Sequence, residues 1–369
     1  MNSIPVAPPL TEYFYRKASA AGVPLSGTFE LTPVCNMDCK MCYVRLSKEE
    51  QESICPLHDA DDWLALAKSA SEAGMLYLLI TGGEPFLHPQ IQQILEGLNK
   101  LGLIVSINSN GTLIDEKTVS WLKKTPPVRV NISIYGASDE TYANLCNNPN
   151  GFTQVKKAIR LLKEAGISVK LNCSLTPHNV HDLPQIVDFA KENGLILQVA
   201  TYMFPPSRKS EELVGTNDRL TPEQASYYAA YSDYLLYGKE KFLENECSVS
   251  FDAEDNCLEL GDGIRCRAGK CSFWITWKGT ITPCGMFPES DLPNVFETPF
   301  DVAWSRVKEY ASSIVLPAKC AGCSAKNECR ACAAMVITET GCFDKIPQYR
   351  CEMTHSLKEQ WARVKEEIQ

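Results

Sequence analysis

Three cysteines, Cys35, Cys39 and Cys42, stand in the run CNMDCKMCY with three and then two residues between them. This spacing brings three thiolates together on one loop. Cubane [4Fe–4S] clusters normally take four cysteine ligands, so three ligands leave one iron open to a substrate or cofactor. Structural zinc sites prefer four closed ligands, usually in C-x2-C pairs. The loop therefore predicts an iron–sulfur cluster with an open iron.

The cysteine triplet followed by the aromatic Tyr43 resembles the signature of the radical S-adenosylmethionine (SAM) superfamily. The resemblance continues, motif by motif, from about residue 27 to 355. It implies that SAM binds the open iron, with Tyr43 beside the cofactor, and is reductively cleaved to a 5′-deoxyadenosyl radical that abstracts hydrogen from a substrate. The protein then positions the reactants and excludes water and oxygen.

A second motif, GGEP, comprises Gly82, Gly83, Glu84 and Pro85 at the end of a predicted strand. A Gly-Gly pair after a strand by itself indicates only a turn. The resemblance implies that this motif contacts the SAM amino group. Glycines permit close backbone approach, and a carbonyl or the Glu84 carboxylate can accept hydrogen bonds from an ammonium group.

Polar residues on three neighbouring strands predict the rest of the SAM site. Ser109 and Asn110 end the third strand. Side-chain alternation places Ser133 on the barrel interior, and Asn172 on the fifth strand has the same parity. The resemblance assigns ribose contact to Ser133, and we expect the other three to contact SAM as well.

The chain departs from the family pattern at two positions near this site. Relatives commonly carry Asp two residues after the ribose-contacting Ser, where this chain has Tyr135, and Arg near Cys146. The sequence therefore leaves the partner of the SAM carboxylate open. Cys146 is our candidate catalytic residue, because a thiol facing the SAM pocket would deliver a hydrogen atom to a substrate radical.

A second cysteine array occupies the C-terminal region. Its two C-x2-C pairs would suit zinc. The whole pattern, including Gly279, instead resembles the SPASM extension of radical SAM enzymes, with a final gap of two residues in place of the usual three. The resemblance implies two auxiliary [4Fe–4S] clusters, the first held by Cys266, Cys271, Cys284 and Cys332 and the second by Cys320, Cys323, Cys329 and Cys351.

The remaining cysteines have no assigned metal. Cys342 competes with Cys351 for the last ligand position. By default, unassigned cysteines are buried small hydrophobic residues, and these are Cys55, Cys146, Cys173, Cys247, Cys257 and Cys342.

The predicted fold is α/β, a partial (β/α)6 radical SAM barrel followed by a small cysteine-rich SPASM domain. Apolar strand-like runs alternate with helical patterns. The strands are expected at 28–32, 77–82, 104–109, 128–135, 168–176 and 197–203, and the helices at 61–74, 91–102, 116–124, 152–166 and 183–194. The expected domains are an N-terminal extension (1–26), the barrel (27–235), the SPASM domain (236–355) and a solvated C-terminal helix (356–369).

Composition excludes several other classes of protein. The 369 residues are 44% hydrophobic and 22% charged, which is typical of a soluble globular protein. A net charge of −9 gives no electrostatic footprint for nucleic acid. We find no membrane-length apolar run and no signal peptide, so we expect a cytoplasmic protein. Seventeen cysteines in a chain of this size indicate metal binding rather than disulfides.

SPASM enzymes typically modify ribosomally made peptides, by thioether or carbon–carbon crosslinking, epimerisation or formylglycine formation. Formylglycine formation is disfavoured because Gly285 follows Cys284, where such relatives carry Asp. We expect the auxiliary clusters to accept or relay the substrate electron, and a flavodoxin or ferredoxin to be the reductant. The short segment before the barrel leaves leader-peptide recognition to the barrel, the SPASM region or a separate protein.

Two other interpretations remain. A radical SAM/SPASM enzyme that acts on a small molecule, in haem, cofactor or antibiotic biosynthesis, would share every motif. A non-enzymatic zinc or electron-transfer protein would use the C-terminal cysteines but would leave GGEP and the triplet unexplained. Iron analysis separates the latter, since three cubanes predict about 12 irons per chain.

Overall fold

The computed structural model describes residues 9–215, 218–244, 263–289, 291–321, 323–325, 328–329 and 331–369. Cys247 and Cys257, which we expected to be buried, lie outside these ranges, as do the first residues of the predicted N-terminal extension.

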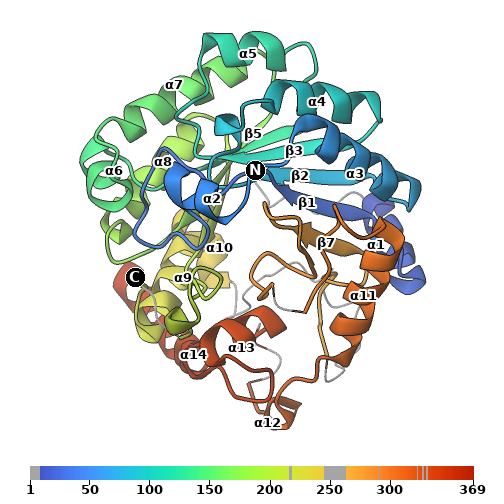
Figure 1. Ribbon diagram of the computed structural model, residues 1–369. Helices are drawn as coiled ribbons and strands as arrows, with labels where there is room; N and C mark the ends of the chain where they lie inside the picture. Colours follow the sequence, from blue (N-terminus) through green and yellow to red (C-terminus); the bar gives the residue numbers. More distant parts are fainter. Residues whose placement is uncertain are drawn as a thin grey trace.

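Six parallel strands form the main part of one sheet and follow one another in chain order. This arrangement confirms the predicted strands and the α/β barrel fold (Figure 1). The strands are β1 (Ser26–Glu30), β2 (Tyr77–Thr81), β3 (Ile104–Ser109), β4 (Arg129–Ser133), β5 (Val169–Ser174) and β6 (Ile196–Ala200).

Helices connect these strands and cover the outer face of the sheet (Figure 1). They are α3 (Ala60–Glu72), α4 (Ile91–Lys100), α5 (Glu116–Leu122), α7 (Gly151–Glu164) and α8 (Leu183–Glu192), one for each predicted helix. In α3, the side chains of Asp59 and Asp62 each accept a hydrogen bond from the other residue's backbone N–H, which forms a capping box. The same helix buries Trp63 and Leu66 on the face that meets the sheet.

The strands alternate as the sequence predicts. Apolar side chains such as Ile132 and Leu171 are fully buried, in the core between the sheet and the outer helices. Ser133, Lys170 and Asn172 are half-buried, because successive side chains on a strand point to opposite faces. The opposite face of the sheet therefore carries the polar groups.

Two strands from the cysteine-rich region extend the sheet, a feature that the sequence did not predict. β7 (Ser272–Ile275) pairs in parallel with β1, and β8 (Ile281–Thr282) pairs antiparallel with β7. Gly279 in the turn between them has φ +93°, and a Cβ there would lie 2.5 Å from Asn294 Oδ1. The glycine of the SPASM-like pattern is thus a turn glycine in the hairpin that joins this region to the barrel.

The other helices enclose the remaining sides of the molecule (Figure 1). Near the barrel they are α1 (Pro9–Ala21), α2 (Lys48–Ile54), η1 (Pro85–Leu87), α6 (Asp139–Cys146), η2 (Val180–Asp182) and η3 (Glu211–Leu213). Beyond them come α9 (Pro222–Tyr237), α10 (Lys239–Glu244), α11 (Phe300–Ser313), α12 (Ala318–Ala321), α13 (Ala333–Thr340) and α14 (Gln348–Ile368).

The prediction of a solvated C-terminal helix is wrong for one face of α14. This helix packs along α9 and buries Met353, Leu357, Trp361 and Val364. The Trp361 ring stacks on Phe242 of α10 with centroids 4.6 Å apart. The tail was predicted to be solvated because charged residues separate these apolar positions along the chain. In the helix, the apolar positions share one side.

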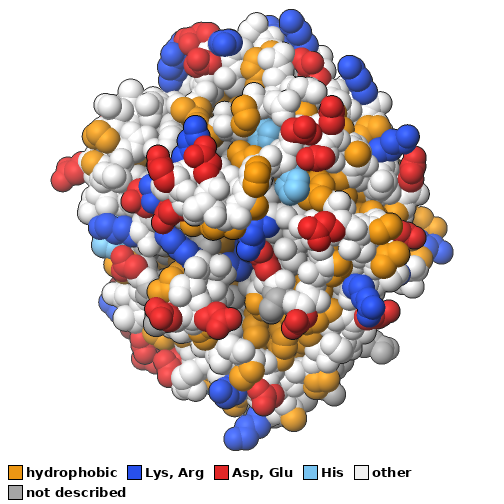
Figure 2. Space-filling view, viewed as in Figure 1, with side chains coloured by type: hydrophobic (Ala, Val, Ile, Leu, Met, Phe, Trp, Pro, Cys, Tyr) orange, Lys and Arg blue, Asp and Glu red, His pale blue; other side chains and the backbone are white. Residues whose placement is uncertain are grey.

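The surface carries charges of both signs. Figure 2 shows Lys and Arg side chains interspersed with Asp and Glu over the face in view. Among the described helices, none is both long and apolar enough to cross a membrane.

Candidate active site

The cysteine loop begins at the carboxyl end of β1 and lies over the end of α6. Backbone N–H groups hold two of its sulfurs, with Met37 N 3.4 Å from Cys35 Sγ and Arg45 N 3.3 Å from Cys42 Sγ. The loop is further anchored by Asp38 N, which donates to the Cys146 carbonyl at 3.0 Å. Cys35, Cys39 and Cys42 are therefore held on one short, half-buried loop.

The thiols of this loop have raised pKa values, so they ionise readily only when they bind metal. Burial raises the pKa of Cys35 to about 12 and also raises the pKa of Cys42. The pKa of Cys39 is raised first by its hydrogen bond with the Cys146 thiol and then by burial. Metal binding deprotonates such thiols, because the charge of the metal stabilises the thiolate. Among the described residues, no group of three or more Cys, His, Asp or Glu side chains converges on the position of a single ion. The cysteines of a cubane bind separate irons, so their sulfurs lie farther apart.

GGEP packs directly against the segment that leads into the cysteine loop. Gly83 N donates to Thr32 O at 2.6 Å, and Glu84 N donates to Val34 O at 2.9 Å. A Cβ on Gly82 would lie 2.6 Å from Thr32 O, and one on Gly83 would lie 2.5 Å from Val34 O. Both positions therefore require glycine, because the backbone of the segment before the cysteine loop leaves no room for a Cβ. This close packing holds GGEP beside the cysteines.

The Glu84 carboxylate is fully buried and already has protein partners. It accepts hydrogen bonds from Ser109 Oγ at 2.9 Å, from Asn110 N at 2.8 Å and from Phe86 N at 3.2 Å. Burial raises its pKa to about 7. The carbonyls of the motif are consequently the better acceptors for an ammonium group, while Glu84 ties GGEP to the end of β3.

Asn110 connects this end of β3 to the cysteine loop. Its Nδ2 donates to Asn36 Oδ1 at 2.9 Å and lies 3.6 Å from Cys35 Sγ. Its Oδ1 accepts from Thr112 N at 2.9 Å. Ser109 thus contacts GGEP, and Asn110 joins GGEP to the cysteine loop. The contact of both residues with SAM stays a prediction.

Asn172 and Ser133 lie on adjacent strands in register with each other. The buried Asn172 Oδ1 has no hydrogen-bond partner within the described part of the chain. A buried polar atom without a partner is costly unless a ligand or water satisfies it. Its place on the polar face therefore fits a SAM molecule whose hydroxyl or amino groups donate to Oδ1.

Cys146 ends α6 beneath the cysteine loop and is fully buried. Its thiol is hydrogen-bonded to that of Cys39. This geometry gives Cys146 a place under the cluster-binding loop, and its predicted role as a hydrogen-atom donor stays a prediction. Cys173 is also buried, among the apolar residues of the core, as we expected.

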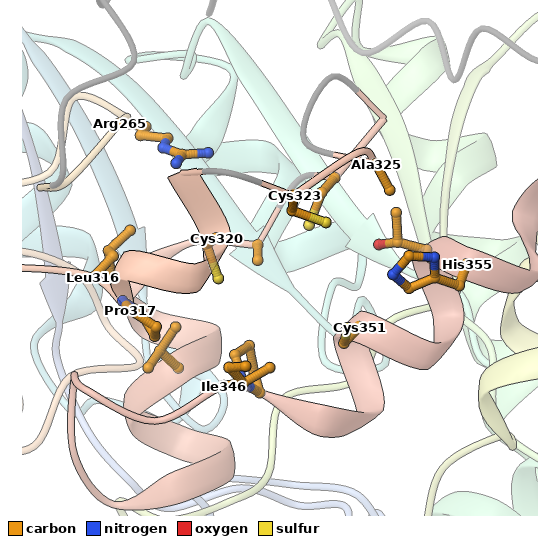
Figure 3. A pocket seen from close by; sticks show the side chains of 14 residues that line it. Arg265, Leu316, Pro317, Cys320, Cys323, Ala325, Ile346, Cys351 and His355 are labelled. Atoms are coloured by element: carbon orange, nitrogen blue, oxygen red, sulfur yellow. The ribbon is translucent and has the colours of Figure 1, made fainter.

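Four cysteines of the second array line one cavity of about 50 Å³. Figure 3 shows Cys320, Cys323 and Cys351 around this space, with Cys351 presented by α14, and Cys329 also lines it. Cys342 does not line the cavity and instead contacts Thr340. The donor set therefore fits the proposed second auxiliary cluster with Cys351 as its last ligand.

The other predicted ligands gather on the barrel side of this region. Cys266, Cys284 and Cys332 pack against one apolar cluster that includes Phe287. Cys266 contributes to raising the pKa values of both Cys284 and Cys332, after the larger effect of burial. Cys271 is fully buried against α1, where its thiol hydrogen-bonds to Ser19, and its pKa is raised by burial with a smaller contribution from Cys266.

Comparison with known proteins identifies the family. The sequence model described as the radical SAM superfamily matches residues 29–190. A probable GTP 3′,8-cyclase of Methanococcus maripaludis is 31% identical over 261 residues, which span 69% of this chain and 82% of that protein. This chain belongs to the radical SAM superfamily. It is therefore an enzyme that uses SAM and a [4Fe–4S] cluster.

Other relatives of this radical SAM enzyme differ in what their names describe. The AdoMet-dependent heme synthase of Methanosarcina barkeri is 24% identical over 334 residues, 85% of this chain and 92% of that protein. The antilisterial bacteriocin subtilosin biosynthesis protein AlbA of Bacillus subtilis is 26% identical over 281 residues, 76% of this chain and 59% of that protein.

Solved structures share the fold across nearly the whole chain. Streptococcus suis SuiB bound to its precursor peptide SuiA gives a TM-score of 0.63 at 22% identity, covering 95% of this chain and 82% of that one. The structure of anSMEcpe with bound AdoMet gives a TM-score of 0.68 at 18% identity, covering 94% of this chain and 99% of that one. The similarity includes the C-terminal region as well as the barrel.

Sequence reasoning missed Glu30 and Arg208 in this radical SAM enzyme. The two side chains form a buried ion pair, with Arg208 Nη2 3.0 Å from Glu30 Oε1. One signal was available, since Glu30 is a charged residue in a parallel strand expected to be buried on both faces. A buried carboxylate requires a charged partner, but the sequence could not indicate which one.

Proposed function

We propose that this radical SAM enzyme modifies a ribosomally made peptide, by forming a thioether or carbon–carbon crosslink or by epimerisation. The observation that carries the proposal is the second cysteine array, whose members Cys320, Cys323, Cys329 and Cys351 line one cavity. Such an array in addition to the SAM-binding triplet is typical of peptide-modifying members of the superfamily. The name of AlbA and the precursor peptide bound to SuiB agree with this assignment.

The proposed cofactor set is SAM and three [4Fe–4S] clusters. Cys35, Cys39 and Cys42 would hold the cluster that binds SAM, and the C-terminal array would hold two closed auxiliary clusters. When reduced, the first cluster supplies the electron that converts SAM into methionine and the radical that abstracts hydrogen from the peptide.

The residues of the chain bind and orient the cofactor. Carbonyls of GGEP would accept from the SAM amino group, and Ser133 and Asn172 would bind the nucleoside from the polar face of the sheet. Glu84 and Asn110 hold GGEP, the end of β3 and the cysteine loop together through the hydrogen bonds described above. The buried position of this assembly keeps bulk water away from the reacting groups.

The proposal also covers the domains, the reductant, the cellular setting and the recognition of the peptide. It consists of the domain boundaries given above, a flavodoxin or ferredoxin as reductant, a cytoplasmic setting, and leader recognition by the barrel, the SPASM region or a separate protein. The mixed charges on the face shown in Figure 2, together with the net charge of −9, agree with a partner other than nucleic acid.

One alternative function has a specific observation in its favour. The heme synthase of Methanosarcina barkeri matches this chain over 92% of its own length, so a small-molecule substrate for this fold is chemically reasonable. The test of the proposal must therefore separate peptide modification from SAM cleavage.

The test is anaerobic incubation with SAM, a reductant and the peptide encoded nearest the gene, followed by mass spectrometry. Loss of a pair of hydrogens means crosslinking, and unchanged mass with deuterium gained from heavy water means epimerisation. If 5′-deoxyadenosine forms while the peptide stays unchanged, the small-molecule alternative replaces the proposal.

Two variants control the experiment. Cys39→Ala should abolish 5′-deoxyadenosine formation because it removes a ligand of the SAM-binding cluster. Cys55→Ala is the matched control, since Cys55 lies at the end of α2, outside both arrays, and should retain formation of 5′-deoxyadenosine.

A further inference from the structure

Arg208 occupies a buried position between the barrel and the cysteine-rich region. It lies in the segment between β6 and η3, and its side chain is only 5% exposed. Its two terminal nitrogens form a bidentate pair with Glu30 at the end of β1, at 3.1 and 3.0 Å. Arg208 Nη1 also donates to the Gly285 carbonyl at 2.7 Å.

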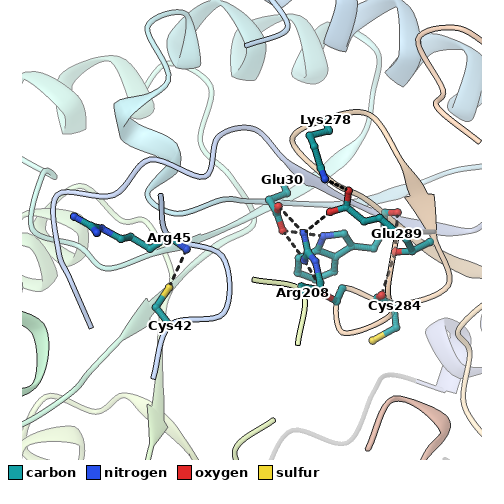
Figure 4. A network of polar contacts seen from close by, with 10 residues as sticks. Glu30, Cys42, Arg45, Arg208, Lys278, Cys284 and Glu289 are labelled. Atoms are coloured by element: carbon teal, nitrogen blue, oxygen red, sulfur yellow. Dashed lines mark hydrogen bonds and ion pairs between the residues drawn. The ribbon is translucent and has the colours of Figure 1, made fainter. Parts of the chain in front are cut away.

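This one side chain contacts the residue that follows a cysteine in each array, and Figure 4 shows its pairing with Glu30 and Glu289. Tyr43 follows Cys42, and its ring centroid lies 5.7 Å from the Arg208 guanidinium carbon. Gly285 follows Cys284 and accepts the hydrogen bond from Nη1. A Cβ on Gly285 would lie 2.7 Å from the Trp274 ring, so this close approach requires glycine.

The charges around Arg208 are balanced and their geometry is well defined. Trp274 Nε1 on β7 donates to Glu30 Oε2 at 3.2 Å. Glu289 lies 3.4 Å from Arg208 Nη2 and forms an ion pair with Lys278 at 2.5 Å. A buried ion pair is favourable only when hydrogen bonds compensate its desolvation, and a bidentate Arg–carboxylate pair fixes orientation as well as charge.

We propose that Arg208 is a positioning residue that fixes the spacing between the SAM-binding cluster and the first auxiliary cluster, and that its buried positive charge raises the reduction potential of that auxiliary cluster. The inference rests on the proposed set of three clusters. A reduced cluster carries one more negative charge than the oxidised cluster, so a nearby buried cation stabilises the reduced form. Net charge and hydrogen bonding near a cluster are known determinants of its potential.

The experiment compares three variants of the full-length, anaerobically reconstituted protein. Glu30→Gln combined with Arg208→Gln removes both charges of the pair and keeps the network neutral. Arg208→Lys retains the charge but loses the bidentate geometry. Arg306→Gln is the control, since Arg306 is an exposed residue of α11, with 69% of its side chain accessible.

Redox titration followed by electron paramagnetic resonance measures the potential of each cluster, and iron analysis measures cluster content. We expect the double variant to retain iron while one auxiliary cluster shifts to a more negative potential, because Arg208 is the member of the pair that contacts Gly285 beside Cys284, so its charge acts on that cluster more strongly than the charge of Glu30. Arg208→Lys should keep most of the potential but alter the magnetic interaction between reduced clusters. Both variants should lower the amount of modified product formed per 5′-deoxyadenosine on the order of tenfold, as is typical when residues that support metal ligands are changed. Arg306→Gln should give the same values as the unchanged protein.

The same measurements separate the role of Arg208 from the proposed set of clusters. If the unchanged protein shows no auxiliary-cluster signal, both the cofactor set and the inference are overturned. If all clusters are present and the potentials and magnetic interactions are the same in every variant, only the role of Arg208 is overturned. Should the double variant lose its iron, Arg208→Lys decides, because it leaves Glu30 paired with a cation.

Discussion

Glu84 shows how one buried carboxylate can hold two loops of the proposed cofactor site together. Its three accepted hydrogen bonds come from η1 and from the end of β3. These bonds give the loop after β2 and the loop after β3 a fixed relation to each other. The side chain thus bonds to groups within the protein, so we expect the backbone carbonyls of GGEP to be the acceptors for SAM.

We expect Glu84→Ala to destabilise the fold by about 3 kcal/mol, because it leaves buried donors without an acceptor. Chemical denaturation of the apoprotein measures this change. Glu72→Ala is the control, since Glu72 is a surface residue of α3 with 69% of its side chain accessible, and should change the free energy of unfolding by less than about 0.5 kcal/mol. Equal stability of the two variants would contradict the role of Glu84.

The free energy of unfolding should depend on pH because Glu84 titrates. Burial raises its pKa to about 7 from the ordinary 4.5, so between these values the folded protein keeps a proton that the unfolded chain has released. The contribution of this carboxyl to the free energy of unfolding therefore falls as pH rises from about 4.5 to about 7, and is constant outside that window.

Denaturation of the apoprotein over this pH range tests the assignment, with Glu84→Gln as the comparison. The substitution should flatten the decline, because an amide does not titrate. A decline of the same size in Glu84→Gln would show that another group causes it.

At the scale of elements, GGEP depends on the absence of side chains. A Cβ at Gly83 would meet backbone oxygens at 2.4 and 2.5 Å, and these atoms belong to the segment that enters the cysteine loop. Backbone cannot rotate away as a side-chain tip can, so any added atom must displace one segment from the other.

We therefore expect Gly83→Ala to weaken SAM binding on the order of tenfold or more, measured by calorimetry on the reconstituted protein. Gly102→Ala separates this effect from simple loss of glycine flexibility. Gly102 has φ +75°, and a Cβ there meets no atom within 4 Å among the described residues, so it should cost about 1 kcal/mol of stability and leave SAM affinity unchanged. Unchanged affinity in Gly83→Ala would contradict the packing argument.

The C-terminal helix links global stability to the proposed second auxiliary site. α14 presents Cys351 near its start and Trp361 three turns later, where Trp361 stacks on Phe242. Trp361→Ala should destabilise the protein by about 3–5 kcal/mol, as is usual for truncating a buried aromatic residue.

Thermal and chemical denaturation measure this loss, and Arg363→Ala on the exposed side of the same helix is the control. Arg363 forms an ion pair with Glu367, lies 4.8 Å from the ring centroid of Tyr227 on α9, and has a side chain that is 60% accessible, so its removal should cost about 1 kcal/mol. A small effect of Trp361→Ala would restore the solvated-helix interpretation.

At the scale of the whole molecule, ligands that are far apart in the chain must meet in one cavity. Cys351 lines the cavity with Cys320, Cys323 and Cys329, whereas Cys342 does not. Anaerobic reconstitution of Cys351→Ala should therefore reduce iron from about 12 to about 8 per chain if the cluster is lost. Cys342→Ala should keep all of the iron, and the reverse pattern would assign the ligand to Cys342.

The sequence determined the chemistry and the local elements of this protein. The cysteine triplet, GGEP and the alternation on β4 and β5 are short-range patterns, which depend on spacing within one loop or on the two-residue period of a strand. Six strands and five outer helices could be located for the same reason, because burial of one face imposes a regular pattern on each segment.

Only the tertiary structure decided which distant groups share a site. It joined β7 to the edge of β1, used Glu84 within the protein, placed Cys146 against Cys39, buried one face of α14 and paired Glu30 with Arg208. Each of these contacts links segments whose separation along the chain carries no periodic signal. Partners of this kind are set by the packing of whole elements and by the need of buried polar groups for partners, so they become visible only when the chain is folded.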